Sequence, residues 1–183
     1  MRRPGGLWRH RDFLSLWGAE TISQFGSQVS LLALPLVAII ALDEITFRVA
    51  LLTTVEFLPF LLFTLPAGVW VDRLRRRPIL ILGDLGRAAA LVSVPVAHWL
   101  GVLTIWQLYA VGFATGICTV FFDVAYQSYL PALIGREQIV EGNSKLEISR
   151  SAANIAGPGL AGLLVAALTA PVDRKSTRLN SSH

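Results

Sequence analysis

The chain has 183 residues, of which 54% are hydrophobic and only 15% are charged. This composition excludes an ordinary soluble domain and predicts an all-α, polytopic membrane helix bundle. The formal net charge of +4 is no evidence for nucleic-acid binding, because the arginines gather near the N-terminus and in residues 73–77, where membrane topology needs them. The single cysteine, Cys118, lies inside an apolar run, so no disulfide framework is possible, and no metal or cofactor is expected.

Five apolar runs have lengths that suit membrane-spanning helices. Residues 1–12 are basic and are expected to form a cytoplasmic N-terminus, and residues 13–172 are expected to form a transmembrane bundle. Positive charge falls on alternate loops, which agrees with this orientation. The expected spans are about 13–42, 47–70, 78–100, 105–130 and 148–170.

Polar side chains interrupt the first two spans. Glu20 and Gln24 belong to a polar half of the first span that should line a bundle interior or a wet cavity rather than face lipid. Glu56 should lie nearer the middle of the membrane. Because an ionisable group inside a span is costly, the two glutamates are candidates for coupling an ion to a substrate, and Gln24 for the substrate path. The alternative for Glu20 is a shallow position that reaches cytoplasmic water.

A short basic loop, Gly68-x-x-x-Asp72-Arg73-x-x-Arg76-Arg77, separates the second and third spans. Gly68 has no side chain, so another helix can approach closely there. Asp72 lies at the negative end of its own helix dipole, and it is therefore expected to serve a neighbouring helix or an arginine. The arginines can pair with it or with anionic lipid headgroups. The alternative interpretation is a simple positive-inside anchor.

The third and fourth spans contain further charged and small residues. Asp84 and Arg87 are three residues apart, so they share a helix face and can neutralise each other. Gly112-x-x-x-Gly116 predicts a face on which another helix packs closely. Asp123 follows in the half of the fourth span that is nearer the cytoplasm.

The fifth span contains Gly157-Pro158, followed by Gly162. The proline removes one backbone hydrogen bond and predicts a kink, and the small residues allow a neighbouring helix to pack tightly or slide. An ordinary packing kink without a transport role is the alternative.

Residues 173–183 lack hydrophobic periodicity, and their codons can spell a common sequencing adapter. They are interpreted as an adapter-derived tail and excluded from fold reasoning. The natural protein is then expected to continue past Val172. Without the tail, Lys145 is the only lysine against many arginines, which indicates a GC-rich bacterial genome.

These motifs resemble those of the major facilitator superfamily. The loop at residues 68–77 is similar to the superfamily's loop between helices two and three, with Arg75 where a glycine is usual. Residues 157–162 resemble its antiporter motif, with Ala161 in place of one glycine. Phe121-Phe122-Asp123-x-Ala125, then Leu130-Pro131-x-Leu133 and Asn143, resembles the branch of enterobactin exporters and macrolide-efflux-like proteins.

The resemblance covers about residues 8–172 and implies helices one to five of twelve, an incomplete N-terminal half of the fold. It implies a secondary transporter of the bacterial plasma (inner) membrane that exports a drug or siderophore by alternating access, coupled to an ion, in the first place the proton. Many proton-coupled relatives have an arginine where this chain has Gly112. The implied partners are the substrate, the coupling ion, membrane lipids and the missing C-terminal half, with no nucleic acid.

The resemblance also suggests a conformational latch made of the basic loop and an acid on the fourth helix. In this hypothesis Asp123 pairs with Arg76 or Arg77, and Asp72 caps a helix of the missing half.

Three other functions remain open at this point. The first is an uptake carrier of the same superfamily, and the second is a non-transporting membrane scaffold with five spans. The third is a membrane-embedded enzyme, which the sequence does not favour, because it lacks Gly-x-Ser-x-Gly, His-Glu-x-x-His and paired intramembrane aspartates. No catalytic residues are therefore expected.

Overall fold

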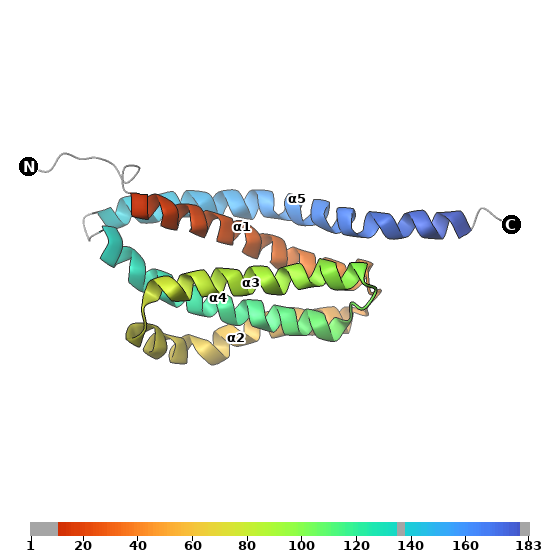
Figure 1. The fold of residues 1–183 in the computed structure, drawn as a ribbon, viewed down its shortest axis with the longest axis horizontal. Coiled ribbons are helices and arrows are strands. Elements are labelled where there is room, and N and C mark those ends of the chain that lie inside the picture. Colours follow the sequence, from red (N-terminus) through yellow and green to blue (C-terminus); the bar gives the residue numbers. More distant parts are fainter. Residues whose placement is uncertain (1–10, 135–137, 180–183) are drawn as a thin grey trace, which may run out of the picture.

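The computed structural model describes residues 11–134 and 138–179, which form five α-helices joined by short turns (Figure 1). No strand occurs in these two ranges, so the expected all-α bundle is confirmed. The helices are α1 (Arg11–Ile40), α2 (Thr46–Arg73), α3 (Arg76–Trp99), α4 (Ile105–Ile134) and α5 (Ile139–Leu179).

Helices α1 to α4 are long and apolar enough to cross a membrane. The first four expected spans lie on them, and the fifth, 148–170, lies within α5 and stays a prediction. α5 also continues through residues 173–179, for which the sequence shows no hydrophobic periodicity. The expectations for the basic N-terminus concern residues that lie mostly outside the described ranges.

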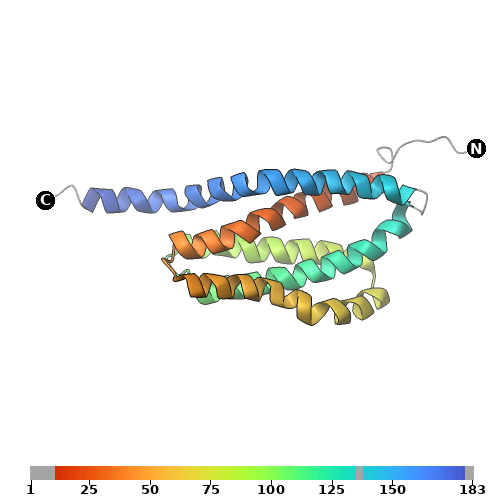
Figure 2. The ribbon, with the colours of Figure 1, turned by 180° about the vertical axis from the view of Figure 1, so that it is seen from behind.

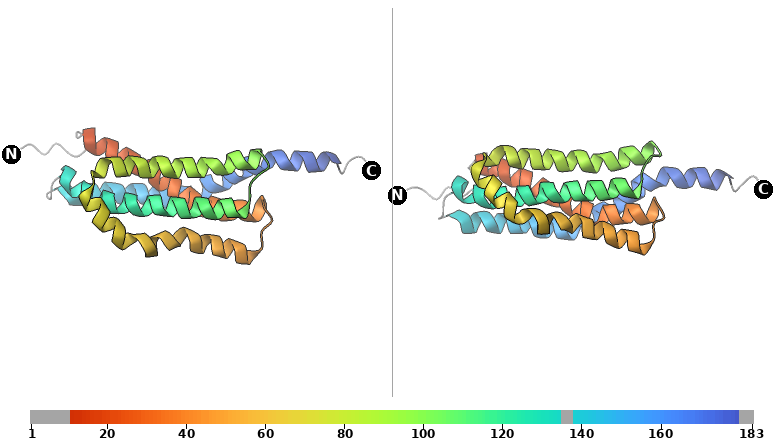
Figure 3. Two further views of the ribbon diagram at one scale, coloured as in Figure 1. Left: turned by 60° about the horizontal axis from the view of Figure 1, so that its bottom comes forward. Right: turned by 90° about the horizontal axis from the view of Figure 1, so that it is seen from below.

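The helices form two groups that face each other across the bundle. α4 lies between α2 and α3 and packs extensively against both, and α5 packs along α1 (Figures 2 and 3). Contacts between the two groups are sparse. Hydrogen bonds also tie α5 to α1: Thr21 Oγ1 donates to Ser149 Oγ at 3.0 Å and Trp17 Nε1 donates to the Lys145 carbonyl at 3.4 Å.

The turn after α3 is closed by a glycine with φ +69°. Gly101 N–H donates to the His98 carbonyl and Val102 N–H to the Ala97 carbonyl, each at 3.0 Å, which is the paired pattern of a Schellman C-cap. A left-handed residue at this position reverses the chain at no steric cost when it is glycine. α4 can therefore return directly alongside α3.

Two apolar clusters close the bundle at its ends. One lies near the α1–α2 and α3–α4 turns and includes Leu34, Leu52 and Leu108. The other lies near the α2–α3 turn and includes Phe13 and Phe122. Large apolar side chains also cover the outside of the helices, as expected for a surface that meets lipid.

Close packing of α2 on α4 depends on the two glycines of the Gly112-x-x-x-Gly116 pattern, and the prediction of a close packing face is confirmed. A Cβ at Gly112 would lie 2.9 Å from Glu56 Cγ, and one at Gly116 would lie 2.7 Å from both the Glu56 carbonyl oxygen and Pro59 Cγ. α2 contains Pro59 and Pro66 and is visibly bent (Figure 2). Prolines are a usual cause of such bends.

We expect Gly116→Ala to destabilise the chain, because the new methyl group meets backbone that must move. Overpacking of this kind costs about 1–3 kcal/mol. Gly159→Ala in α5 is the matched control: no described atom lies within 4 Å of its Cβ position, so only the helix-propensity gain, up to about 1 kcal/mol, should appear. SDS titration in mixed micelles measures both free energies of unfolding, and equal effects would contradict this account of the packing.

Candidate functional site

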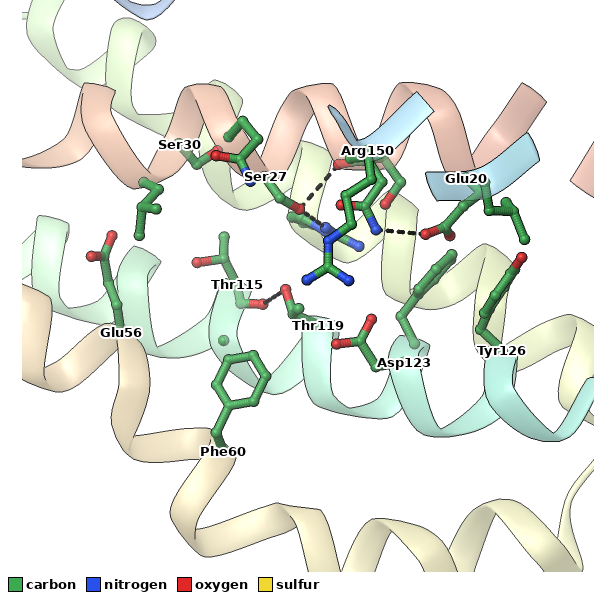
Figure 4. Close-up of a pocket in the computed structure, with 18 of the residues that line it drawn as sticks. Glu20, Ser27, Ser30, Glu56, Phe60, Thr115, Thr119, Asp123, Tyr126 and Arg150 are labelled. Atoms are coloured by element: carbon green, nitrogen blue, oxygen red, sulfur yellow. Dashed lines mark hydrogen bonds between the residues drawn. The ribbon is translucent and has the colours of Figure 1, made fainter. Parts of the chain in front are cut away.

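A polar cavity of about 780 Å³ lies between the two apolar clusters (Figure 4). Its volume falls within the roughly 300–1,000 Å³ of small-molecule sites. All five helices contribute to its wall, which includes four carboxylates and two guanidinium groups. The ionisable wall residues are Glu20, Glu56, Arg87, Asp123, Glu147 and Arg150.

Arg87 of α3 is the most constrained charge in the wall. Its side chain is 7% exposed, its Nη2 lies 3.2 Å from Asp84 Oδ1, and its Nη1 donates to Ser27 Oγ of α1. Ser23 Oγ of α1 donates to the same Asp84 oxygen at 2.9 Å. The guanidinium carbon also lies 5.5 Å from the centre of the Phe122 ring, within cation–π range. One buried ion pair thereby connects α1, α3 and α4.

Glu20 and Gln24 lie on the α1 wall, as Figure 4 shows for Glu20. Gln24 Nε2 donates to Glu20 Oε1 at 2.6 Å. Glu20 is 6% exposed and its second oxygen has no hydrogen-bond partner among the described residues. The buried hydroxyl of Tyr126 likewise has none. Glu20 is therefore a buried residue of the cavity wall, and its depth in the membrane stays a prediction.

Asp123 of α4 and Arg150 of α5 face each other across the cavity (Figure 4). Asp123 is close enough to Arg150 and Arg87 for their positive charges to act on it. The hypothetical pair of Asp123 with Arg76 or Arg77 is absent. Arg76 instead donates from Nη1 to the Ser128 carbonyl at 3.2 Å. Ser128 lies five residues beyond Asp123, about 7.5 Å further along the helix axis.

Glu56 of α2 lies at the other end of the cavity (Figure 4). Its Oε2 atom is buried without a hydrogen-bond partner among the described residues. Within the described ranges, the Glu56 carboxylate forms no ion pair, and no nearby charged group acts on it. The main influence on this carboxylate is its burial away from water. Glu56 is thus a cavity acid that forms no ion pair within the part of the chain that the structure describes.

The basic loop lies at the α2–α3 end, outside the cavity. Asp72, Arg73 and Arg77 are exposed, and Asp72 makes no hydrogen bond or ion pair with a residue that the structure describes. No described atom lies within 4 Å of a Cβ built on Gly68, so the close helix approach expected there is not made by any of these five helices.

The antiporter-like motif is only partly in contact with the bundle. A Cβ on Gly157 would lie 2.6 Å from Gln28 Cβ of α1, so this glycine sets the α1–α5 distance. Pro158 and Gly162 are exposed, and nothing described lies within 4 Å of a Cβ at Gly162. α5 continues through Pro158 as one unbroken helix.

Sequence reasoning missed Arg150 as a site residue, although it falls inside an expected span and the cost of burying a charge could have identified it. Tyr126 gave no comparable signal, because a tyrosine in a membrane helix is commonplace. Thr115 and Thr119 also line the cavity, and only the rotation of α4 decides this.

A family model described as "Transmembrane secretion effector", within the major facilitator superfamily, matches residues 6–173. The chain is 28% identical over 170 residues to "Uncharacterized MFS-type transporter YfiS" of Bacillus subtilis (strain 168), covering 92% of this chain and 39% of that protein. It is 29% identical over 155 residues to "Macrolide efflux protein A" of Streptococcus pyogenes, covering 83% and 37%. It is 32% identical over 117 residues to "Multidrug efflux pump Tap" of Mycolicibacterium fortuitum, covering 61% and 28%.

The chain therefore spans about two fifths of the length of the first two of these curated relatives. No solved structure matches it. The family match, together with four helices long and apolar enough to cross a membrane, supports a multi-pass membrane protein.

We expect Arg87→Met to destabilise the bundle by about 3 kcal/mol, the low end of the cost of breaking a buried ion pair, because Asp84 is 32% exposed. Adding Asp84→Asn should restore part of the loss, since no unpaired charge then remains. Arg48→Met is the control, because Arg48 pairs with Glu44 on the surface, where such pairs contribute about 0.5 kcal/mol. SDS titration in mixed micelles measures all four proteins. A loss at Arg87 no larger than at Arg48 would show that the pair is not structural.

Proposed function

Because the chain belongs to the transmembrane secretion effector family of the major facilitator superfamily, we propose that it is part of a carrier that exports a small molecule from a bacterial cell. The observation that carries the proposal is the polar cavity, which all five helices line and which is large enough for such a molecule. Two relatives are named for efflux, one of macrolides and one of several drugs. A drug or siderophore is the proposed cargo.

The proposed carrier has a second half that follows this chain. Coverage of 39% and 37% of two relatives supports this. In carriers built from repeats, the substrate site lies near the membrane midplane between the repeats, and alternating access moves one bundle against the other around it. The cavity of this chain would then be one wall of the complete site.

Ion coupling is assigned to carboxylates of the cavity. Glu20 and Glu56 each have a buried oxygen without a partner among the described residues. Binding a proton removes the charge of a carboxylate and with it most of the cost of keeping that group away from water. A proton entering from outside could therefore exchange for a polar or cationic substrate that leaves.

The basic loop is proposed as the inner latch of the carrier. The start of α1 and the α2–α3 turn lie at the same end of the bundle (Figure 1), and an Arg-rich end is expected on the cytoplasmic side. Exposed Asp72 is free to cap a helix of the second half. Asp123 has no part in this latch. The exposed face of α5 at Pro158 and Gly162 is a second surface on which a further helix can pack.

An accumulation assay tests the export proposal. The reading frame is first followed past the Val172 codon, where further hydrophobic helices are expected, and the complete gene is expressed in a bacterium that lacks its own drug pumps. Cells should then accumulate less labelled macrolide or cationic dye than vector controls, and a protonophore should remove the difference. Higher accumulation than in the controls would indicate uptake, and no effect with any compound would contradict export.

Asp72→Asn in the complete protein should lower efflux by up to about fivefold, because the charge of a helix cap is worth up to about 1 kcal/mol. The amount of protein in the membrane should stay unchanged. Asp43→Asn, at the opposite end of the bundle in the α1–α2 turn, is the matched control and should leave efflux unaltered. If both variants transport like the parent, the latch does not exist.

A further inference from the structure

We propose that Glu56, Phe57 and Phe60 form a subsite for an organic cation, a compact ammonium or phosphonium group that carries apolar substituents. The proposal rests on the proposed export function, since it identifies the class of substrate that the cavity takes. It assigns the binding of the organic cation to one end of the cavity.

The rest of the cavity wall contains two guanidinium groups, Arg87 and Arg150, among its other acids. Arg87 pairs with Asp84 and also donates to Ser27. Asp123 faces the positive charges of Arg150 and Arg87. A cation from outside would have to compete there with two guanidinium groups that are fixed in the wall. This end is therefore poorly suited to bind a second positive charge.

Glu56 has the opposite environment. No described cation acts on its carboxylate, and Oε2 is buried without a hydrogen-bond donor. Its side chain is nevertheless held in place, because it lies against Gly112 so closely that a Cβ there would stand 2.9 Å from Glu56 Cγ. A fixed carboxylate at the wall of a cavity needs either a proton or a cation to offset its charge.

The two rings beside Glu56 suit a weakly hydrated cation. Phe57 and Phe60 line the same cavity, their centroids are 6.2 Å apart and they are inclined at 39°. They are 55% and 38% exposed, so their surfaces are accessible. Phenyl faces attract cations, and more strongly where water is excluded.

A bare metal ion fits this end less well. Calcium and magnesium need about six or more oxygen ligands. Beside the Glu56 carboxylate, the hydroxyl groups in this part of the wall are those of Ser30 and Thr115, and each already donates to a backbone carbonyl, of Gly26 at 2.7 Å and of Gly112 at 2.9 Å. The apolar side chain of Leu31 also lines the wall and suits a hydrocarbon substituent.

Binding of two probes of matched shape and opposite charge to the purified chain in detergent tests the subsite. Tetraphenylphosphonium should bind more tightly than tetraphenylborate, each corrected for protein-free micelles. Glu56→Gln should weaken phosphonium binding by at least about tenfold, as expected when one partner of a desolvated charge pair is removed. Glu44→Gln is the matched control, because Glu44 pairs with Arg48 in the α1–α2 turn outside the cavity wall, and it should weaken phosphonium binding by less than about threefold. Borate binding should not fall in either variant.

A second variant keeps the test decisive if Glu56→Gln does not elute as a monodisperse species. Phe60→Leu should weaken phosphonium binding by about threefold, in line with the loss of one cation–π contact. Phe63→Leu is its control, because the Phe63 ring packs at 6.3 Å on Phe113 and is not part of the cavity wall.

Absence of phosphonium binding above the micelle background, or equal losses in Glu56→Gln and Glu44→Gln, would overturn the subsite. This experiment requires no transport. If binding depends on Glu56 while the complete gene exports nothing, the subsite stands and the export function fails. If export occurs but phosphonium binding does not depend on Glu56, the subsite alone is refuted.

Discussion

The buried pair of Arg87 and Asp84 fixes the relation between the two helix groups. α1 and α3 have few direct contacts, yet Arg87 reaches Ser27 and Asp84 accepts from Ser23. The guanidinium group is 7% exposed; its Nη1 and Nη2 atoms have these partners, and its Nε atom is buried without one among the described residues. Its partners therefore hold α1 and α5 at a set distance from the α2–α3–α4 group. The cavity is the space that this distance leaves between the apolar clusters.

The second constraint is the absence of a side chain at two positions of α4. Gly112 and Gly116 bring α2 so close that the Glu56 side chain crosses the face of α4 and reaches the cavity. Apolar packing thereby determines where a carboxylate lies. This differs from the Arg87 end, where hydrogen bonds and an ion pair determine it. The two ends of one cavity thus acquire different chemistry: guanidinium groups among carboxylates at one end, and a single acid beside two phenyl rings at the other.

The basic loop illustrates what a motif leaves undetermined. The resemblance to the superfamily suggests that Arg76 or Arg77 pairs with Asp123. Arg76 instead reaches the last turns of α4 at the Ser128 carbonyl, while the Asp123 side chain points into the cavity toward Arg150. Sequence spacing indicated at which end of α4 Asp123 lies, but not where its side chain points. The rotation of α4 against its neighbours decides that direction.

The sequence by itself determined the all-α membrane bundle and the close packing at Gly112 and Gly116. These properties follow from hydrophobic length and from local spacing along one helix. Only the tertiary structure brought Glu20, Asp123 and Arg150 from three helices into one cavity and left Glu56 apart from them. The physical reason is that a charge inside a membrane bundle is stabilised by whichever partner the packing of another helix places beside it, and no pattern within a single helix encodes that partner.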